Sequence, residues 1–268
     1  MSLSKRAMDF EEFRIKVKSH LGFDLTSYKP AQLQRRLESF MARKRVSGYE
    51  EYYRLLSRDA NLLEELVNYL TINVTEFFRD ISAWQRLERE ILPRLAAEYK
   101  PLRIWSAACS NGAEPYSLAI MLKELGINGR SIEATDINEE VLQLAAAGRY
   151  PLSLCRNISA SRMQRYFTQS GDTAVVIPEI RRMVNFRRHD LLKDAISQGY
   201  HLIVCRNVQI YFTREAQLRL NERLVKALVN GGVLFIGASE SILDYKPLSL
   251  ERLAPCFYRK NIVLTTLS

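Results

Sequence analysis

Residues 103–117 combine residue types that suit the binding of a small anionic group. They read Arg-Ile-Trp-Ser-Ala-Ala-Cys-Ser-Asn-Gly-Ala-Glu-Pro-Tyr-Ser, which predicts a buried strand, a turn of small residues, and a helix opened by Glu114 and Pro115. Small residues such as Ala108 and Gly112 leave room for a ligand at the turn. The free N–H groups at the helix start favour a carboxylate or phosphate.

A second acidic position follows one strand later. Residues 131–135 are predicted to form a strand that ends at Asp136, whose carboxylate can accept hydrogen bonds from both hydroxyls of a ribose. The turn lacks the three spaced glycines of a pyrophosphate-binding loop. This argues against NAD or FAD and allows S-adenosylmethionine (SAM), with Glu114 as the acid for its amino-acid end. The alternative is a tight strand-to-helix turn packed on small residues, without a ligand.

Two further groups of polar residues follow predicted strands, at the edge where open α/β sheets bind ligands. Asp190 follows the third strand and can accept a hydrogen bond from an adenine amino group, while Leu191 can pack on the ring. Arg206, Asn207 and Tyr211 follow the fourth, where polar side chains need a partner. For Tyr211, a core position with its hydroxyl in water is the alternative.

Arg79 is predicted to lie at a position that is unfavourable for a positive charge. Asn73 and Thr75 have side chains that suit the end of one helix and the start of another. Arg79 then precedes the next helix, where the helix dipole disfavours a positive charge. This indicates a local anionic partner for Arg79, either a ligand or an ordinary ion pair with Asp80 or Glu76.

Composition sets the class of protein. The chain has 268 residues, 47% of them hydrophobic, and a formal net charge of +9, which indicates an acidic partner. Its four cysteines are widely spaced, and no apolar run approaches the ~18 residues of a membrane span. We therefore expect a cytoplasmic protein with no metal site, no disulfides and no insertion into a membrane.

The first part of the chain is predicted to be helical. Hydrophobic residues recur at helical spacing from Phe10 to Leu21, from Pro30 to Met41, and in two stretches between Tyr49 and Leu70. The second of these helices carries a group of cations that we call the basic ridge: Arg35, Arg36, Arg43 and Lys44. This surface suits an acidic partner, and the alternative is a solvated helix face.

From residue 102 onward strands alternate with helices, so we expect an α/β domain with a mostly parallel sheet. The junction is predicted between Leu92 and Leu102, which gives a helical domain of residues 1–92 and an α/β domain of residues 93–268. Residues of about 150–182 are interpreted as a small inserted subdomain with antiparallel strands. The segment 256–264 is predicted to be an antiparallel edge strand.

Five motifs in order resemble the chemotaxis receptor methyltransferases of the CheR type. They are residues 71–79 (Thr-Ile-Asn-Val-Thr-Glu-Phe-Phe-Arg), 105–117, 134–137 (Ala-Thr-Asp-Ile), 205–212 (Cys-Arg-Asn-Val-Gln-Ile-Tyr-Phe) and 237–241 (Gly-Ala-Ser-Glu-Ser). The resemblance covers nearly the whole chain. The family pattern usually has Thr, Glu and His where this chain has Asn111, Ala113 and Ala238.

The resemblance implies a small N-terminal helical domain for substrate recognition, followed by a Rossmann-like, class I SAM-dependent methyltransferase domain. The activity implied is methyl transfer from SAM to glutamate side chains on the cytoplasmic helical bundle of chemoreceptors, giving methyl esters and S-adenosylhomocysteine (SAH). Arg79 and Tyr211 are then the expected catalytic residues, the basic ridge the receptor-binding surface, and a monomer the expected state. The expected cofactor-binding residues are Asn73, Thr75, Arg79, Ala108, Gly112, Glu114, Asp136, Ile137, Asp190, Leu191, Arg206, Asn207 and Val208.

Two alternatives belong to other classes of function. A nucleic-acid methyltransferase would suit the basic charge, but the (Asp/Asn)-Pro-Pro-(Tyr/Phe) turn typical of amino methylation is replaced by Arg206-Asn-Val-Gln209. We therefore expect no nucleic-acid partner. A SAM-binding regulatory protein without turnover is the other alternative, based on Ala113 and Ala238.

Overall fold

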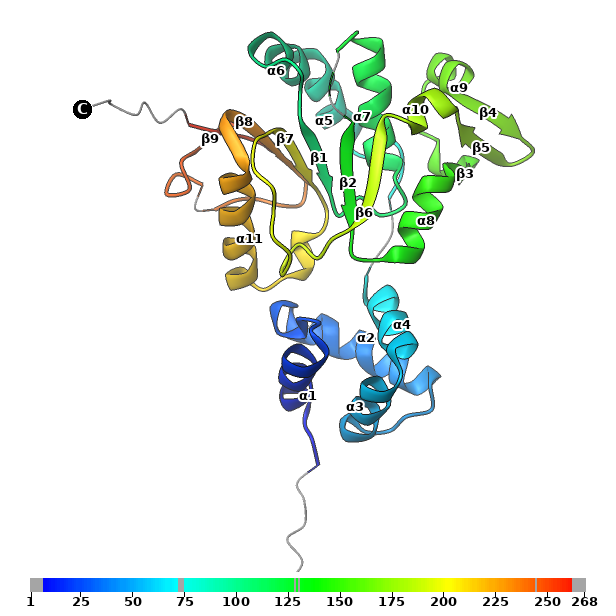
Figure 1. The fold of residues 1–268 in the computed structure, drawn as a ribbon, viewed down its shortest axis with the longest axis vertical. Coiled ribbons are helices and arrows are strands. Elements are labelled where there is room, and N and C mark those ends of the chain that lie inside the picture. The colour runs from blue at the N-terminus through cyan, green and yellow to red at the C-terminus, as the bar shows by residue number, and fades with distance from the viewer. Residues whose placement is uncertain (1–6, 72–74, 128, 130, 244, 262–268) are drawn as a thin grey trace, which may run out of the picture. The chain divides into compact units, whose positions relative to one another are not determined.

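The structure is a computed structural model that describes residues 7–71, 75–127, 129, 131–243 and 245–261 (Figure 1). The chain forms two compact units. The first contains Met1–Ile72 and Tyr211–Leu218, and the second contains Asn73–Ile210 and Arg219–Ser268.

The first unit is helical, as predicted. Apolar side chains that recur every three or four residues give each helix one buried face, on which Phe13, Leu37, Tyr52 and Leu66 are almost fully buried. The left-handed backbone of Gly22 (φ 75°) ends the first helical stretch. The helices are α1 (Phe10–Lys16, continued by a π-helical turn Val17–Leu21), a 3₁₀ turn Leu25–Ser27, α2 (Pro30–Arg43), α3 (Tyr49–Arg58) and α4 (Ala60–Leu70).

The segment that carries Tyr211 pairs with the chain just before α2. The Lys29 amide donates to the Tyr211 carbonyl (2.9 Å), and the Thr213 amide donates to the Ser27 carbonyl (2.8 Å). Tyr28 and Phe212 form an antiparallel bridge and pack edge to face, with ring centroids 5.2 Å apart. Tyr211 thereby belongs to the helical unit, although it is distant from it in sequence.

The second unit is built on a sheet whose strands, among the described residues, run in the order β6-β2-β1-β7-β8-β10-β9. The first five of these pair in parallel, and the last two are antiparallel. The chain first builds outward from β1 to β2 and β6 and then crosses to β7 on the other side of β1. The strands are β1 (Ile104–Ala107), β2 (Ile132–Asp136), β6 (Val184–Arg188), β7 (Tyr200–Cys205), β8 (Leu228–Ile236), β9 (Leu250–Ala254) and β10 (Phe257–Lys260).

Helices connect the parallel strands, as the alternation predicted. Gly148, in the left-handed conformation, ends α8. The first residues of α11 belong to the first unit and the rest to the second. The helices are α5 (Ile81–Arg86), a π-helical turn Leu87–Ile91, α6 (Leu92–Glu98), α7 (Ala113–Glu124), α8 (Glu139–Ala147), α9 (Ala160–Tyr166), α10 (Pro178–Arg181) and α11 (Arg214–Ala227), with 3₁₀ turns at Leu152–Leu154 and Gln209–Tyr211.

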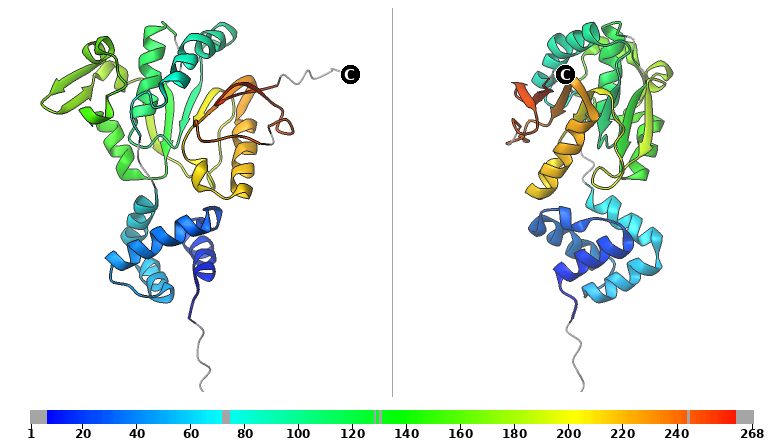
Figure 2. Two further views of the ribbon diagram at one scale, coloured as in Figure 1. Left: turned by 180° about the vertical axis from the view of Figure 1, so that it is seen from behind. Right: turned by 60° about the vertical axis from the view of Figure 1, so that its left-hand side comes forward.

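An inserted subdomain was predicted at about residues 150–182, and its antiparallel sheet is present. β3 (Arg149–Pro151), β5 (Thr173–Val176) and β4 (Phe167–Ser170) pair antiparallel in that order. Figures 1 and 2 both place this small sheet beside the β6 side of the main sheet, away from β9.

Two expectations differ from the structure. The predicted junction at residues 92–102 lies inside the second unit, because Trp84, Leu87 and Leu92 share one core with β1 and β7. The C-terminal strand is antiparallel as predicted, but it is not at the edge. β10 lies between β8 and β9, and β9 was missed because the adjacent charged residues Glu251 and Arg252 interrupt its apolar pattern.

Among the described residues no helix is long and apolar enough to cross a membrane. The reversal of strand order between β1 and β7 has a direct consequence for the location of a ligand. Open α/β sheets bind ligands at the carboxyl ends of the strands where the order reverses. The residues after β1, β2 and β7 are therefore the ones to examine.

Candidate cofactor site

The turn between β1 and α7 has a backbone that few sequences can adopt. Ala108 (φ 60°), Ser110 (φ 51°) and Gly112 (φ 86°) all lie in the left-handed region. A Cβ on Gly112 would come within 2.8 Å of the Ala145 Cβ and 3.0 Å of the Phe186 ring. Glycine is therefore required for packing against α8 and β6, which differs from the predicted reason, room for a ligand. Ala108 is half-buried on the same turn.

Asp136 lies at the end of β2 and joins this turn. Its carboxylate accepts the amide hydrogens of Ser110 (2.8 Å) and Asn138 (3.1 Å). Burial raises the pKa of Asp136, although these two hydrogen bonds oppose the rise. The Ile137 amide also bonds this carboxylate. A carboxylate has about four acceptor positions, so roughly one remains for a hydroxyl group of a ligand.

The Ser110 hydroxyl, on the same turn, is suited to bind a polar ligand. The Ser110 hydroxyl is buried and has no hydrogen-bond partner among the described residues. Buried hydroxyls are rarely left unpaired, so this atom indicates a missing partner at the turn. The SAM site predicted around this turn therefore agrees with the donors and acceptors that are present.

Glu114 and Arg206 form a buried ion pair at the start of α7. The Ser106 hydroxyl donates to Glu114 Oε1 (2.8 Å), and Arg206 Nη1 lies 3.6 Å from Glu114 Oε2. Burial raises the pKa of Glu114, and the Arg206 guanidinium opposes this rise. An acid held in this way can pair with the ammonium group of an amino acid.

Arg206 also fixes the segment that contains Arg79. Its Nη2 donates to the Asp80 carboxylate (2.6 Å) and to the Arg79 carbonyl (3.0 Å). The residues on either side of Arg79, Phe78 (φ 51°) and Asp80 (φ 65°), have left-handed backbones, a conformation that costs energy and is common at functional sites. Asp80 pairs with Arg206 and Glu76 pairs with Arg156.

The residues predicted to bind the adenine, Asp190 and Leu191, follow the end of β6. The His189 amide donates to the Asp136 carbonyl (2.9 Å), which brings Asp190 and Leu191 close to the end of β2. Asp190 Oδ1 accepts the Leu192 amide (2.8 Å), and burial raises the pKa of Asp190. Leu191 is almost fully buried.

The remaining predicted cofactor-binding residues lie after β2, after β7 and before α5. Ile137 is half-buried, and its carbonyl accepts a hydrogen bond from Arg188 Nε (3.3 Å). Asn207 and Val208 are half-buried in the loop after β7, and Thr75 is half-buried before α5. Asn73 lies outside the described residues.

Tyr211 and the basic ridge belong to the helical unit. Arg36 and Arg43 both lie over the Tyr69 ring, with their guanidinium carbons 5.1 and 4.9 Å from its centre. Lys44 forms an ion pair with Glu65, and Arg35 is exposed. The ridge is therefore partly ordered by contacts within its own unit.

Three residues of the site were not predicted. Ser106 in β1 and Ser110 in the following turn lie in the motif that contains Glu114, but the sequence does not indicate that the Ser106 hydroxyl bonds Glu114 or that the Ser110 amide bonds Asp136. Asp80 was considered only as a partner of Arg79. Asn111, which replaces the usual Thr of the resembling family, accepts the amide of Ala113, the first residue of α7, through Oδ1 (3.1 Å).

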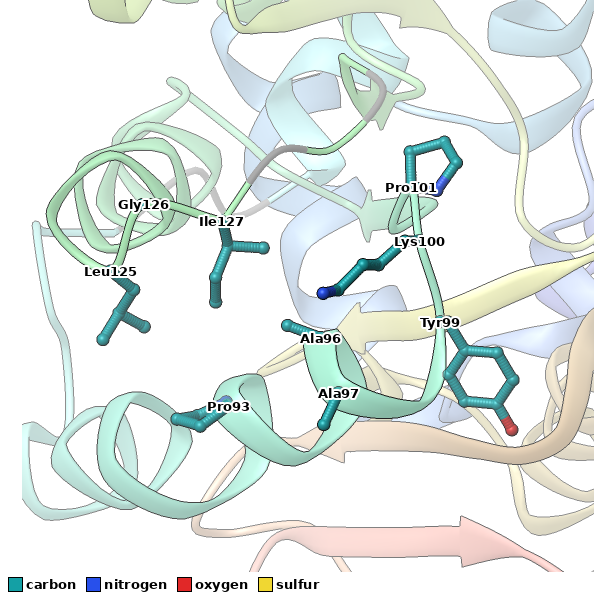
Figure 3. Close-up of a pocket in the computed structure, with 9 residues that line it drawn as sticks. All are labelled: Pro93, Ala96, Ala97, Tyr99, Lys100, Pro101, Leu125, Gly126 and Ile127. Carbon is teal, nitrogen blue, oxygen red and sulfur yellow. The ribbon is translucent and has the colours of Figure 1, made fainter.

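A cavity of about 700 Å³ lies on the second unit, away from the predicted site residues (Figure 3). Its lining comes from α6, the segment before β1 and the residues just after α7, at the amino ends of the strands. No predicted site residue lines it: the lining residues are Pro93, Ala96, Ala97, Tyr99, Lys100, Pro101, Leu125, Gly126 and Ile127. The described residues also contain no cluster of His, Cys, Asp or Glu that could hold a metal ion.

Comparison with known proteins agrees with this geometry. Residues 73–252 match the family described as CheR methyltransferase, SAM binding domain, and residues 8–71 match its all-alpha domain. Chemotaxis protein methyltransferases of Listeria innocua and Listeria monocytogenes are each 42% identical over 94% of this chain and 97% of their own length. Chemotaxis protein methyltransferase 1 of Pseudomonas aeruginosa is 37% identical over 90% of this chain and 92% of its own. The chain therefore belongs to the CheR methyltransferase family and is a SAM-dependent methyltransferase.

Proposed function

We propose that this methyltransferase transfers the methyl group of SAM to glutamate side chains on the cytoplasmic helices of chemoreceptors. The observation that carries the proposal is the buried group of Glu114, Arg206 and Asp136 at the carboxyl ends of β1, β2 and β7, in a chain of the CheR family. The relatives named as chemotaxis protein methyltransferases support the receptor as the substrate. We propose a cytoplasmic monomer.

The residues of the second unit suit the parts of SAM. Glu114, held by Ser106 and Arg206, would bind the ammonium group, and Asp136 a ribose hydroxyl. Asp190 and Leu191 would bind the adenine, with Ala108, Gly112, Ile137, Asn207 and Val208 around the cofactor and Asn73, Thr75 and Arg79 in the segment before α5. When bound, SAM supplies a methyl group on a positively charged sulfur.

The acceptor carboxylate needs no general base. A glutamate has an ordinary pKa of ~4.3 and is already ionised at neutral pH. What remains for the protein is to place the carboxylate in line with the methyl group and to exclude water. We assign the orientation of the carboxylate to the Arg79 guanidinium and the Tyr211 hydroxyl.

A small cavity within the helical unit supports the role of Tyr211. Its volume is about 140 Å³, several times the roughly 30 Å³ that one water occupies. Basic and hydroxyl groups surround it, which suits a carboxylate: the lining is Tyr28, Lys29, Gln32, Leu33, Arg35, Arg36, Leu70 and Tyr211. We propose that the side chain of the acceptor glutamate enters this cavity.

The basic ridge would hold the rest of the receptor helix. Receptor methylation helices are rich in carboxylates, and the stacking of Arg36 and Arg43 on Tyr69 orders two of the four cations in advance. The hairpin between β4 and β5 turns within Gly171 and Asp172, so it lacks a longer insert for binding the receptor tail. We propose that methylation does not depend on that tail.

Transfer of a labelled methyl group tests this function. The substrates are a receptor cytoplasmic fragment, the same fragment without its last residues, and RNA. We expect transfer to both fragments and none to RNA, and slower transfer at high salt because the ridge acts through screened charges. Label in RNA alone would instead support a nucleic-acid methyltransferase, and SAM binding without transfer would support a regulatory protein.

Variants of the helical unit separate the catalytic part from the docking part. Tyr211→Phe is expected to lower kcat while SAM affinity stays unchanged. Arg43→Glu together with Lys44→Glu, two ridge residues that do not line the Tyr211 cavity, is expected to raise the KM for the receptor fragment. Arg54→Glu on α3, whose side chain is 64% exposed, reverses a charge away from the ridge and serves as the control. Dependence on the tail with no effect of the ridge reversals would contradict the proposed docking surface.

A further inference from the structure

The Glu240 carboxylate accepts hydrogen bonds from backbone amides of the loop after β7. Its Oε2 accepts the amide hydrogens of Asn207 (2.9 Å) and Gly237 (2.7 Å), and its Oε1 accepts those of Val208 (3.0 Å) and Gln209 (2.8 Å). Four backbone donors from two segments therefore meet on one carboxylate. Three of them are consecutive in the loop that carries Asn207 and Val208.

The local backbone explains how three successive amides can point the same way. Asn207 is left-handed (φ 58°) and is followed by the 3₁₀ turn Gln209–Tyr211. Such an arrangement turns successive N–H groups toward one point and creates a site for an anion. In this protein the anion is the side chain of Glu240.

Gly237 lets the two segments approach each other. A Cβ at this position would lie 2.8 Å from Asn207 Nδ2 and 2.8 Å from Glu240 Oε2. The Glu240 amide donates back to the Gly237 carbonyl (3.0 Å), which closes the turn after β8. The motif 237–241 thus has a physical purpose that its sequence alone did not reveal.

We infer that Glu240 is a positioning residue for SAM, because it holds the loop of Asn207 and Val208 in the conformation that meets the cofactor. The inference rests on the proposed placement of SAM beside this loop. A carboxylate is required, since it offers two acceptor oxygens, whereas an amide offers one oxygen and turns an NH₂ donor toward the other N–H groups. In Glu240→Gln two of the four amides therefore lose their acceptor.

The expected effect is on affinity more than on the chemical step. If the loop takes the binding conformation only a fraction of the time, the apparent dissociation constant rises by the inverse of that fraction. A competent fraction of about one tenth corresponds to a tenfold weaker binding, or about 1.4 kcal/mol. The kcat at saturating SAM should change by less than about threefold, since bound SAM selects the competent loop.

The test compares wild type, Glu240→Gln and a matched control, Glu251→Gln. Glu251 carries the same charge and pairs with Arg259 on the β9-β10 hairpin. SAH binding is measured by calorimetry, kcat and KM for SAM by methyl transfer, and exchange of amides 207–209 by hydrogen–deuterium exchange. We expect about tenfold weaker SAH binding and faster exchange of these amides in Glu240→Gln only, with exchange in β1 and β7 unchanged.

A second variant covers a failure of Glu240→Gln to fold. Gly237 does not have a left-handed backbone, so Gly237→Ala introduces the close contacts without backbone strain and should weaken SAH binding similarly. Wild-type SAH affinity and wild-type exchange in either folded variant would overturn the inference. If the wild-type chain itself did not bind SAH, the proposed placement of the cofactor would fail instead.

Discussion

Replacing Arg206 with methionine is expected to destabilise the second unit strongly. The guanidinium is only 2% exposed and lies between Asp80 and Glu114. Methionine retains much of the apolar contact with Phe235, whose ring centre lies 4.5 Å from the guanidinium carbon. The change therefore removes the charge and the hydrogen bonds more than the packing.

The size of the expected loss of stability follows from the Glu114 carboxylate, which stays buried without its partner. Glu114 is 7% exposed and retains only the Ser106 hydroxyl of the partners described above. Removing one partner of a buried ion pair costs about 3–5 kcal/mol, because the other charge stays buried without compensation. Arg259→Met is the control, since its partner Glu251 is 51% exposed and such pairs contribute about 0–1 kcal/mol.

Urea unfolding followed by tryptophan fluorescence measures this cost. The chain has two tryptophans, Trp84 and Trp105, and both are buried in the second unit. The signal therefore reports that unit. The double variant Arg206→Met with Glu114→Gln removes the uncompensated charge and should recover most of the lost stability.

Two results would refute the reasoning. One is a cost of Arg206→Met that is no larger than that of Arg259→Met. The other is a double variant as unstable as Arg206→Met alone, which would mean that the loss comes from packing. Either result would also remove the argument that Arg206 holds Glu114 ready for a ligand.

Two further predictions concern the same carboxylates. Burial raises the pKa of Glu114, so its protonation favours the folded state, and its contribution to stability is lost as the pH rises from about 4.3 through the folded value. Without ligand, the stability of Glu114→Gln relative to wild type should therefore increase as the pH rises through that range. A constant difference between the urea midpoints of the two proteins across the pH series would contradict this. Asp136→Ala should weaken SAH binding by about 1–3 kcal/mol, measured by calorimetry, with an unchanged circular dichroism spectrum. Wild-type affinity in that variant would remove Asp136 from the site.

Much of the fold could be predicted because its signals are local. A helix or a buried strand appears in the sequence as a short period of apolar residues. α2 begins at the predicted Pro30, and β2 (Ile132–Asp136) lies within one residue of the predicted strand 131–135. β9 lacks this signal, since Glu251 and Arg252 interrupt its apolar residues. Its pairing with β10 supplies the stabilisation that its own sequence does not indicate.

The domain junction is a different kind of error. Pro93 and Pro101 favour a break in the chain, but α5, the π-helical turn Leu87–Ile91 and α6 follow one another without a gap, and Pro93 lies directly after the π-helical turn. Which unit a helix packs on depends on distant residues. Trp84, for example, packs edge to face with Phe235 of β8. The sequence around these two residues does not indicate this contact.

The same distinction applies to the site. Asp136 and Glu114 were predictable because an acid after a strand, or at the start of a helix, has a meaning that depends only on its neighbours. Gly112 was noticed for a local reason, yet its requirement comes from Ala145 and Phe186. Glu240 had no local meaning, because its acceptor oxygens serve amides some thirty residues earlier. A positioning residue acts through contacts that folding creates, so it becomes visible only when each buried donor is matched with its acceptor.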